Sequence, residues 1–236
     1  MNERKGGLGH RPRRGPGRQP RVAASSPLPS SQQKGPPMPP SKVEIIARET
    51  AYKGYLQVDR IRLRHELFAG GQGPEVRREV IERGHAVAVL PYDPGTDTVV
   101  LLEQFRPGVW AAGETGWMLE IVAGIIEDGE TAEAVARRES LEECGLAVEA
   151  LEPVGRIFVS PGILTETVTI YCGRVDASQA GGIHGVAAEG EDIRVFALPA
   201  TEALAWLQAG RFTNATALVA MQWLALHREA LRARWA

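Results

Sequence analysis

The stretch "GIIEDGETAEAVARRESLEECGL", residues 124–146, decides how the whole chain is interpreted. Thr131 is a residue type that caps the start of a helix, and Gly145 is the type that ends one. Between them the sequence predicts a helix of about fourteen residues, the first clear helix after a series of strand-like runs.

This helix would concentrate negative charge on one face. Glu139, Glu142 and Glu143 stand three and four positions apart, and Glu139 and Glu143 form a like-charge pair that has no compensating partner. On an exposed helix such a pair costs only a few tenths of a kcal/mol, so a solvated acidic face is one interpretation. The other is a cation site, because Mg²⁺ and Mn²⁺ prefer oxygen ligands.

Seven positions of the stretch follow a fixed spacing. They fit the pattern Gly-x5-Glu-x7-Arg-Glu-U-x-Glu-Glu-x-Gly-U, where U is a bulky aliphatic residue, at Gly124, Glu130, Arg138, Glu139, Glu142, Glu143 and Gly145. The arrangement resembles the Nudix box, which marks a superfamily of metal-dependent hydrolases of diphosphate compounds. Leu146 satisfies the second U position, whereas Ser140 departs from the first.

The resemblance implies roles for particular residues. Metal ligands are implied at the carbonyl of Ala123 and the carboxylates of Glu139, Glu143 and Glu191. Glu142 would act in catalysis as a further ligand, directly or through water. Glu130 and Arg138 would form a structural ion pair that orients the loop and the helix. The implied cofactor is Mg²⁺, with Mn²⁺ as the alternative, and it would lower the pKa of the attacking water.

The loop "HGVAAEGED", residues 184–192, holds three acids within a Gly-containing stretch. A general base has to reach the attacking water and still let substrate enter, which suits a loop that closes over the site. The resemblance implies that Glu189 is this base and that Glu191 is a metal ligand. Without the resemblance, these acids would be interpreted as a solvated loop.

The likeness extends over residues 43–236, which resemble the bacterial ADP-ribose diphosphatases of this superfamily. Segments that carry it include "VEIIARET", "EVRREVIERGHA", "LLEQFR", "SPGILTE" and "GIHGVAAEGEDIRV", and Pro161 of "SPG" is typical of this subfamily. The implied reaction is hydrolysis of ADP-ribose to AMP and ribose 5-phosphate. The alternatives are hydrolysis of another nucleoside diphosphate sugar and a module that senses a nucleotide without hydrolysing it.

Substrate contacts are implied at five further positions, namely Tyr55, Arg78, Glu79, Arg106 and Glu166. The two arginines offer guanidinium forks that suit diphosphate oxygens, and the tyrosine ring suits stacking on adenine. The competing interpretations are surface arginines on strands and a strand tyrosine in the core. The resemblance also implies a homodimer in which the region from Val43 onward packs against or exchanges with the partner.

Charge is distributed unevenly along the chain. Residues 1–42 carry nine basic residues against one acid and nine of the sixteen prolines, so we expect a disordered tail, and Met38 is a candidate translation start. The remainder has 18 basic and 28 acidic residues, which argues against a nucleic-acid partner. Two cysteines without metal spacing and the lack of a long apolar run predict a cytoplasmic protein outside the membrane.

The order of elements predicts an α+β fold, a mixed β-sheet sandwiched between helices with an antiparallel strand region before it. Residues 55–68 alternate loosely and predict an edge strand, and Asp93-Pro94-Gly95 predicts a turn between two strands. Residues 117–124 predict one strand, and the segments 200–210 and 214–235 predict two closing helices. We expect residues 43–84 to form the strand region and residues 85–236 the hydrolase domain.

Overall fold

The computed structural model describes residues 38–186, 188 and 190–235, so the predicted tail lies almost entirely outside the described residues. The chain divides into Met1–Pro39 and Pro40–Ala236, and the second unit holds every helix and strand that is described. In these described segments, no helix is both long enough and apolar enough to cross a membrane.

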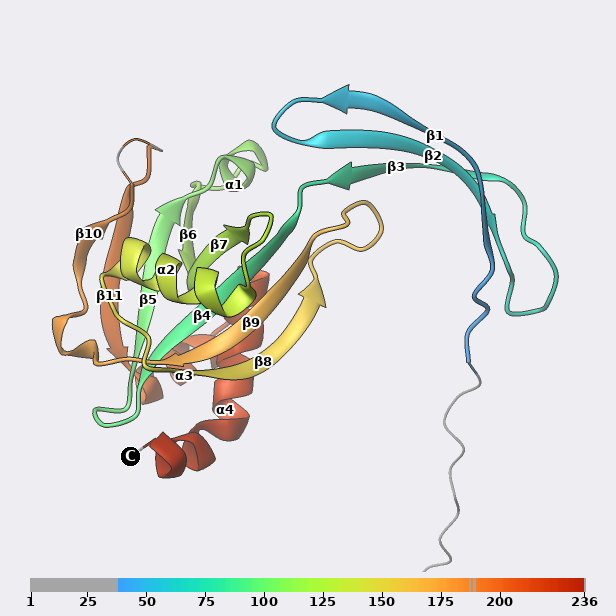
Figure 1. The fold of residues 1–236 in the computed structure, drawn as a ribbon. Helices are drawn as coiled ribbons and strands as arrows, with labels where there is room; N and C mark the ends of the chain where they lie inside the picture. Colours follow the sequence, from blue (N-terminus) through green and yellow to red (C-terminus); the bar gives the residue numbers. More distant parts are fainter. Residues whose placement is uncertain (1–37, 187, 189, 236) are drawn as a thin grey trace, which may run out of the picture. The chain divides into compact units, whose positions relative to one another are not determined.

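An antiparallel sheet of three strands opens the described chain (Figure 1). Its strands are β1 (Val43–Lys53), β2 (Gln57–His65) and β3 (Val76–Glu82). The prediction of an edge strand at residues 55–68 is wrong, because β1 pairs along β2 and leaves it in the middle of the order β1-β2-β3. Arginines and acids pair across these strands, and no apolar side chain of the three strands is fully buried.

The larger sheet has eight strands and follows the order β10-β11-β5-β4-β9-β8, with β6 paired to β5 and β7 paired to β4. The bounds are β4 (His85–Asp93), β5 (Thr98–Phe105), β6 (Trp117–Glu120), β7 (Val122–Ile126), β8 (Ala150–Phe158), β9 (Thr167–Arg174), β10 (Gly182–His184) and β11 (Ile193–Pro199). The β4–β9 pair is parallel and the others are antiparallel, so the sheet is mixed. The single strand predicted at residues 117–124 is two strands, because the chain leaves β5 and joins β4 at Ile121.

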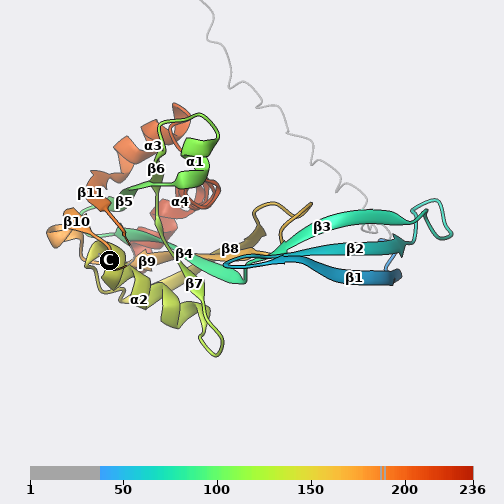
Figure 2. The ribbon, with the colours of Figure 1, turned by 90° about the horizontal axis from the view of Figure 1, so that it is seen from above.

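Helices cover both faces of this sheet. They are α1 (Pro107–Ala111), α2 (Ala132–Cys144), α3 (Ala200–Gln208) and α4 (Ala215–Trp235), with a 3-10 turn η1 at Ala177–Gln179. One buried apolar cluster joins the sheet to α2 and the other joins it to α3 and α4. Figure 2 shows α2 on one side of the sheet and both closing helices on the other. The predicted α+β sandwich is therefore confirmed.

A short junction links β3 to the segment between β8 and β9. The Ile81 N–H donates to the carbonyl of Ile163 at 2.7 Å, and the Thr165 N–H donates to the carbonyl of Ile81 at 3.1 Å. Thr165 Oγ1 also donates to Glu82 at 2.7 Å. These bonds hold the end of the three-stranded sheet on the larger one.

Candidate active site

Both ends of α2 are fixed by local chemistry. Thr131 Oγ1 accepts a hydrogen bond from the Ala134 N–H at 3.2 Å, and Gly145 adopts a left-handed conformation with φ 69°. The predicted helix and both of its caps are confirmed, with α2 thirteen residues long. The helix packs along β7, and Glu139 and Glu143 of its C-terminal half lie against Gly124 and Ala123 of this strand.

Glu143 is the most buried carboxylate of the helix, with 5% of its surface exposed. Its Oε2 accepts a hydrogen bond from the Ala123 N–H at 2.9 Å. Burial raises the pKa of Glu143 to about 8, and the negative charge of Glu139 adds to the effect. A positive partner at this place would therefore stabilise the ionised form.

Glu139 lies directly against β7. A Cβ atom added to Gly124 would stand closer than 3.0 Å to three atoms of the Glu139 side chain, so only glycine leaves this carboxylate its place. Burial raises the pKa of Glu139, and Glu142 acts in the same direction, whereas Arg138 opposes them. The absence of a side chain at Gly124 therefore makes room for the Glu139 carboxylate.

Arg138 binds several acids of the box at once. Its Nη1 donates to Glu139 at 2.9 Å and to Glu142 at 3.1 Å, and its Nε lies 3.6 Å from Glu130. Glu130 in turn accepts from the Glu127 N–H at 3.0 Å in the turn before the helix. A single guanidinium thus connects the turn to the acidic face.

Arg106 comes to the same site from the end of β5. Its Nε and Nη2 donate to one oxygen of Glu120 at 2.9 and 2.6 Å. Burial opposes the charged form of Arg106, but the bonds to Glu120 and the charges of Glu143 and Glu191 raise its pKa overall. Arg106 is therefore within electrostatic reach of two of the proposed metal ligands.

Only part of the predicted acidic loop is described. Glu191 Oε2 accepts a hydrogen bond from the Val186 N–H at 2.9 Å, which closes the loop on itself. Gly185 has φ 102°, and a Cβ there would stand 2.7 Å from the Cβ of Glu191. Glu189, the predicted general base, lies outside the described residues.

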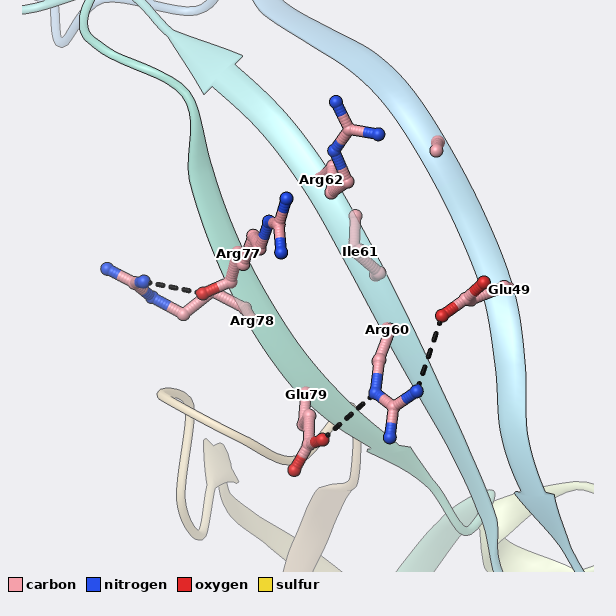
Figure 3. A pocket seen from close by; sticks show the side chains of 8 residues that line it. Glu49, Arg60, Ile61, Arg62, Arg77, Arg78 and Glu79 are labelled. Atoms are coloured by element: carbon pink, nitrogen blue, oxygen red, sulfur yellow. Dashed lines mark hydrogen bonds and ion pairs between the residues drawn. The ribbon is translucent and has the colours of Figure 1, made fainter.

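A second group of predicted residues lies on the three-stranded sheet. Arg78 and Glu79 line a hollow of about 470 Å³ together with residues of β1 and β2. Figure 3 shows Arg60 bridging Glu49 and Glu79, at 3.4 and 3.3 Å, while Arg78 bonds the carbonyl of Arg77 and points away from them. Tyr55 is 83% exposed in the turn between β1 and β2. No hydrogen bond or ion pair among the described side chains joins this group to the acids of α2.

Glu166 lies at the junction and not on an open surface. It is 6% exposed, and its Oε1 accepts from Arg83 Nη1 at 2.8 Å. The side chain is therefore committed to holding the start of β4 on the start of β9.

The acids of α2 have the character of a cation site, although within the described part of the chain no three acids, histidines or cysteines already converge on one point. Glu139 and Glu143 are both largely removed from water with raised pKa values, and they lie beside the Ala123 backbone. A hard divalent cation would relieve the repulsion of these oxygens. The residues present therefore fit Mg²⁺ or Mn²⁺.

Two residues near the site were missed from the sequence. Glu120 is the only charged residue in an apolar strand run, and Asn214 directly precedes α4, where it could be expected to cap the helix. The sequence shows a charged residue in an apolar strand and an asparagine before a helix, but it does not show that these two residues contact each other. Asn214 Nδ2 donates to Glu120 Oε1 at 2.9 Å across 94 positions.

Comparisons with known proteins show which family the chain belongs to. Residues 82–216 match the family described as NUDIX domain. An ADP-ribose pyrophosphatase of Escherichia coli (strain K12) is 51% identical over 194 residues, which cover 82% of this chain and 93% of the relative. An ADP-ribose pyrophosphatase of Haemophilus influenzae is 41% identical over 196 residues, covering 82% and 90%. A GDP-mannose pyrophosphatase of Citrobacter koseri is 34% identical over 149 residues, covering 63% and 77%.

A solved structure shares the fold. It is described as the crystal structure of an ADP compounds hydrolase, and it aligns with a TM-score of 0.59 over 80% of this chain and 97% of its own. At 20% sequence identity this likeness concerns the fold alone. The mixed sheet between helices is therefore an architecture seen in a solved protein.

Proposed function

This chain belongs to the Nudix family, and on that premise we propose that it is an ADP-ribose diphosphatase. It hydrolyses the diphosphate linkage of ADP-ribose to give AMP and ribose 5-phosphate. The observation that carries this conclusion is the 51% identity to an ADP-ribose pyrophosphatase over 93% of its length, in a chain where Gly124 leaves room for the Glu139 carboxylate.

A second substrate follows from a specific observation. GDP-mannose pyrophosphatases are also similar to this chain, at 34–36% identity, so another nucleoside diphosphate sugar is the competing substrate. The higher identity favours ADP-ribose. A nucleotide sensor without activity is the other alternative, and the high identity to pyrophosphatases over 93% of their length argues against it.

Mg²⁺ is the proposed cofactor, with Mn²⁺ as the alternative. Glu139, Glu143, Glu191 and the carbonyl of Ala123 would hold it, with Glu142 directly or through water. When bound, the metal polarises the phosphoryl oxygens and lowers the pKa of the attacking water. Arg138 and Glu130 keep the helix and the preceding turn in register, as their contacts support.

The remaining steps fall to groups of the chain itself. Glu189 accepts the proton of the water that attacks phosphorus. Arg106 donates to oxygens of the diphosphate, and its guanidinium compensates charge that grows on them. The loop that carries Glu189 and Glu191 closes over the substrate and keeps bulk water out.

The proposed active form is a homodimer in which the three-stranded sheet of one subunit completes the site of the other. Arg78, Glu79 and Tyr55 are candidate substrate contacts, yet in a single subunit no described bond connects them to the α2 acids. The same sheet exposes apolar side chains, including Ile45 at 56% and Tyr52 at 60%. Glu166, being paired to Arg83, would support this sheet and reach substrate only indirectly. We place the enzyme in the cytoplasm, where both buried cysteines stay reduced.

The test is turnover of ADP-ribose by the full chain with Mg²⁺. Chromatography should show AMP and ribose 5-phosphate in equal amounts, and kcat/KM for ADP-ribose should exceed that for GDP-mannose. Hydrolysis in ¹⁸O-labelled water would then show which phosphorus is attacked. A higher kcat/KM for GDP-mannose would replace the proposed substrate, and tight ADP-ribose binding without products would identify a sensor.

A further inference from the structure

Glu120 is a buried acid that the proposed reaction leaves without a role. It is 5% exposed, and both of its oxygens are used. Oε2 accepts two N–H groups of Arg106, and Oε1 accepts the amide N–H of Asn214. We propose that Glu120 and Asn214 are positioning residues that hold the Arg106 guanidinium ready for the diphosphate. This inference rests on the proposed function.

Asn214 is held in place at the start of α4. Its Oδ1 accepts from the N–H groups of Thr216 and Ala217 at 3.0 and 3.1 Å, as the cap of α4. The Thr216 hydroxyl donates to the same oxygen at 2.7 Å, so Oδ1 accepts three hydrogen bonds at the start of the helix. The amide nitrogen of Asn214 therefore faces Glu120. The α4 helix is 21 residues long, and its buried face packs in the core. This packing fixes the position of Asn214 at the start of the helix.

Glu120 determines which nitrogen atoms of the Arg106 guanidinium remain free to donate to substrate. Nε and Nη2 are committed to its Oε2, while Nη1 has no acceptor among the described residues. The open edge belongs to a guanidinium that is in electrostatic reach of Glu143 and Glu191. A diphosphate oxygen that accepts from Nη1 would meet a guanidinium that Glu120 already holds in place, so binding requires little further ordering of Arg106.

The backbone of Arg106 is held as well. Its N–H donates to the carbonyl of Gly116 at 2.7 Å, which closes the loop around α1. Gly116 has φ 88°, and a Cβ there would overlap the ring of Phe105. Phe105 in turn meets Trp117 edge to face with ring centroids 5.8 Å apart. Arg106 is thus fixed at its main chain by this loop and at its side chain by Glu120.

A double-mutant cycle distinguishes an effect of Glu120 on the position of Arg106 from an effect of Glu120 on the stability of the fold. Glu120→Gln keeps the size of the side chain but removes one of two acceptor oxygens and the charge. We expect kcat/KM for ADP-ribose to fall about 10–100-fold, as for a misplaced contact group. In an Arg106→Ala background the same change should alter kcat/KM less than about twofold, because its target is gone. An equal fall in both backgrounds would refute the proposal.

Asn214 allows a matched pair of variants. Asn214→Ser keeps an oxygen that caps α4 but is too short to donate to Glu120, whereas Asn214→Ala loses both functions. The serine variant loses the bond to Glu120 but keeps the cap, so its thermal midpoint should fall less than that of the alanine variant, and both should lower kcat/KM several-fold. A serine variant with wild-type kcat/KM would contradict a role in positioning. The control is Glu103→Gln, which breaks a surface ion pair between Glu103 of β5 and Arg194 of β11 and should leave kcat/KM unchanged within about twofold.

A binding measurement keeps this test separate from the proposed function. The cycle is repeated by calorimetry with inorganic pyrophosphate and Mg²⁺, which needs no turnover. Weaker binding by Glu120→Gln only where Arg106 is present would support positioning, even in a protein that did not hydrolyse ADP-ribose. Wild-type hydrolysis together with unchanged kinetics and binding in both positioning variants would refute the positioning role and leave the proposed function intact.

Discussion

Glu139 occupies the space that a side chain at Gly124 would fill. A Cβ on this glycine would lie closer than 3.0 Å to the carboxyl group and the Cγ of Glu139, so the acid rests against the backbone of β7. The neighbouring residue in that strand is Ala123, whose N–H is bonded to Glu143. Two acids of one helix therefore lie against two consecutive residues of one strand, Glu139 against Gly124 and Glu143 against Ala123.

Gly124→Ala should separate activity from stability. The methyl group displaces the end of a flexible side chain, so we expect the free energy of unfolding to change by less than about 1 kcal/mol. Because the Glu139 carboxylate must move, kcat should fall about tenfold or more. Enzyme kinetics and denaturant unfolding measure the two effects. The matched control is Gly155→Ala, where a Cβ meets no atom within 4 Å, and equal activities of the two variants would contradict the fit.

Glu143 should make the metal-free protein sensitive to pH. Its pKa is raised by burial from 4.5 to about 8, so between these values the folded chain binds a proton that the unfolded chain has released. The free energy of unfolding should therefore fall as pH rises through this window. Thermal unfolding in a chelator from pH 5 to 8 should show this for wild type and a flatter profile for Glu143→Gln. Parallel profiles would contradict the assignment.

Asp97 should stabilise the protein without affecting the reaction. It accepts hydrogen bonds from Arg228 Nε and Tyr92 Oη, each at 2.7 Å, and Arg228 holds the pKa of this carboxyl below its usual value. Asp97→Asn keeps a residue type that tolerates the positive φ of this position but loses the charge. We expect a loss of about 2–4 kcal/mol at pH 7 with kcat/KM preserved.

The contribution of Asp97 should also depend on pH. A lowered carboxyl pKa adds stability above the unfolded value of 3.8, and this stability disappears as pH falls through the folded pKa. The difference between wild type and Asp97→Asn in urea unfolding should therefore shrink as acid is added. A difference that stayed constant from pH 7 to pH 3 would show that the ion pair is not its source.

Mixed dimers should reveal whether the sheet serves the partner's site. Arg78→Ala and Glu139→Gln are each expected to be nearly inactive alone. In a hybrid dimer one site combines the intact Glu139 of one subunit with the intact Arg78 of the other. Refolding equal amounts together should then restore about a quarter of the wild-type activity. No recovery, with hybrids verified by mass spectrometry, would place Arg78 in its own subunit's site or outside any site.

The sequence was most informative where structure is local. The caps of α2 and the turn at Asp93 depend on residues a few positions apart, and Asp93 indeed accepts the N–H of Gly95 at 2.8 Å. The partner of β2 depends on which segment pairs with it, so the edge-strand prediction failed when β1 took that place. The Glu120–Asn214 bond joins residues 94 positions apart, and no local pattern specifies such a contact.

In the proposed reaction, the paired acids of α2 hold the metal that drives hydrolysis of ADP-ribose. The most direct measurement compares the kcat of wild type, Glu139→Gln and Glu143→Gln on ADP-ribose at saturating Mg²⁺, with circular dichroism to verify folding. We predict that both variants fold and that each loses about a hundredfold or more in kcat. Wild-type rates in both folded variants would show that Glu139 and Glu143 do not hold a catalytic metal.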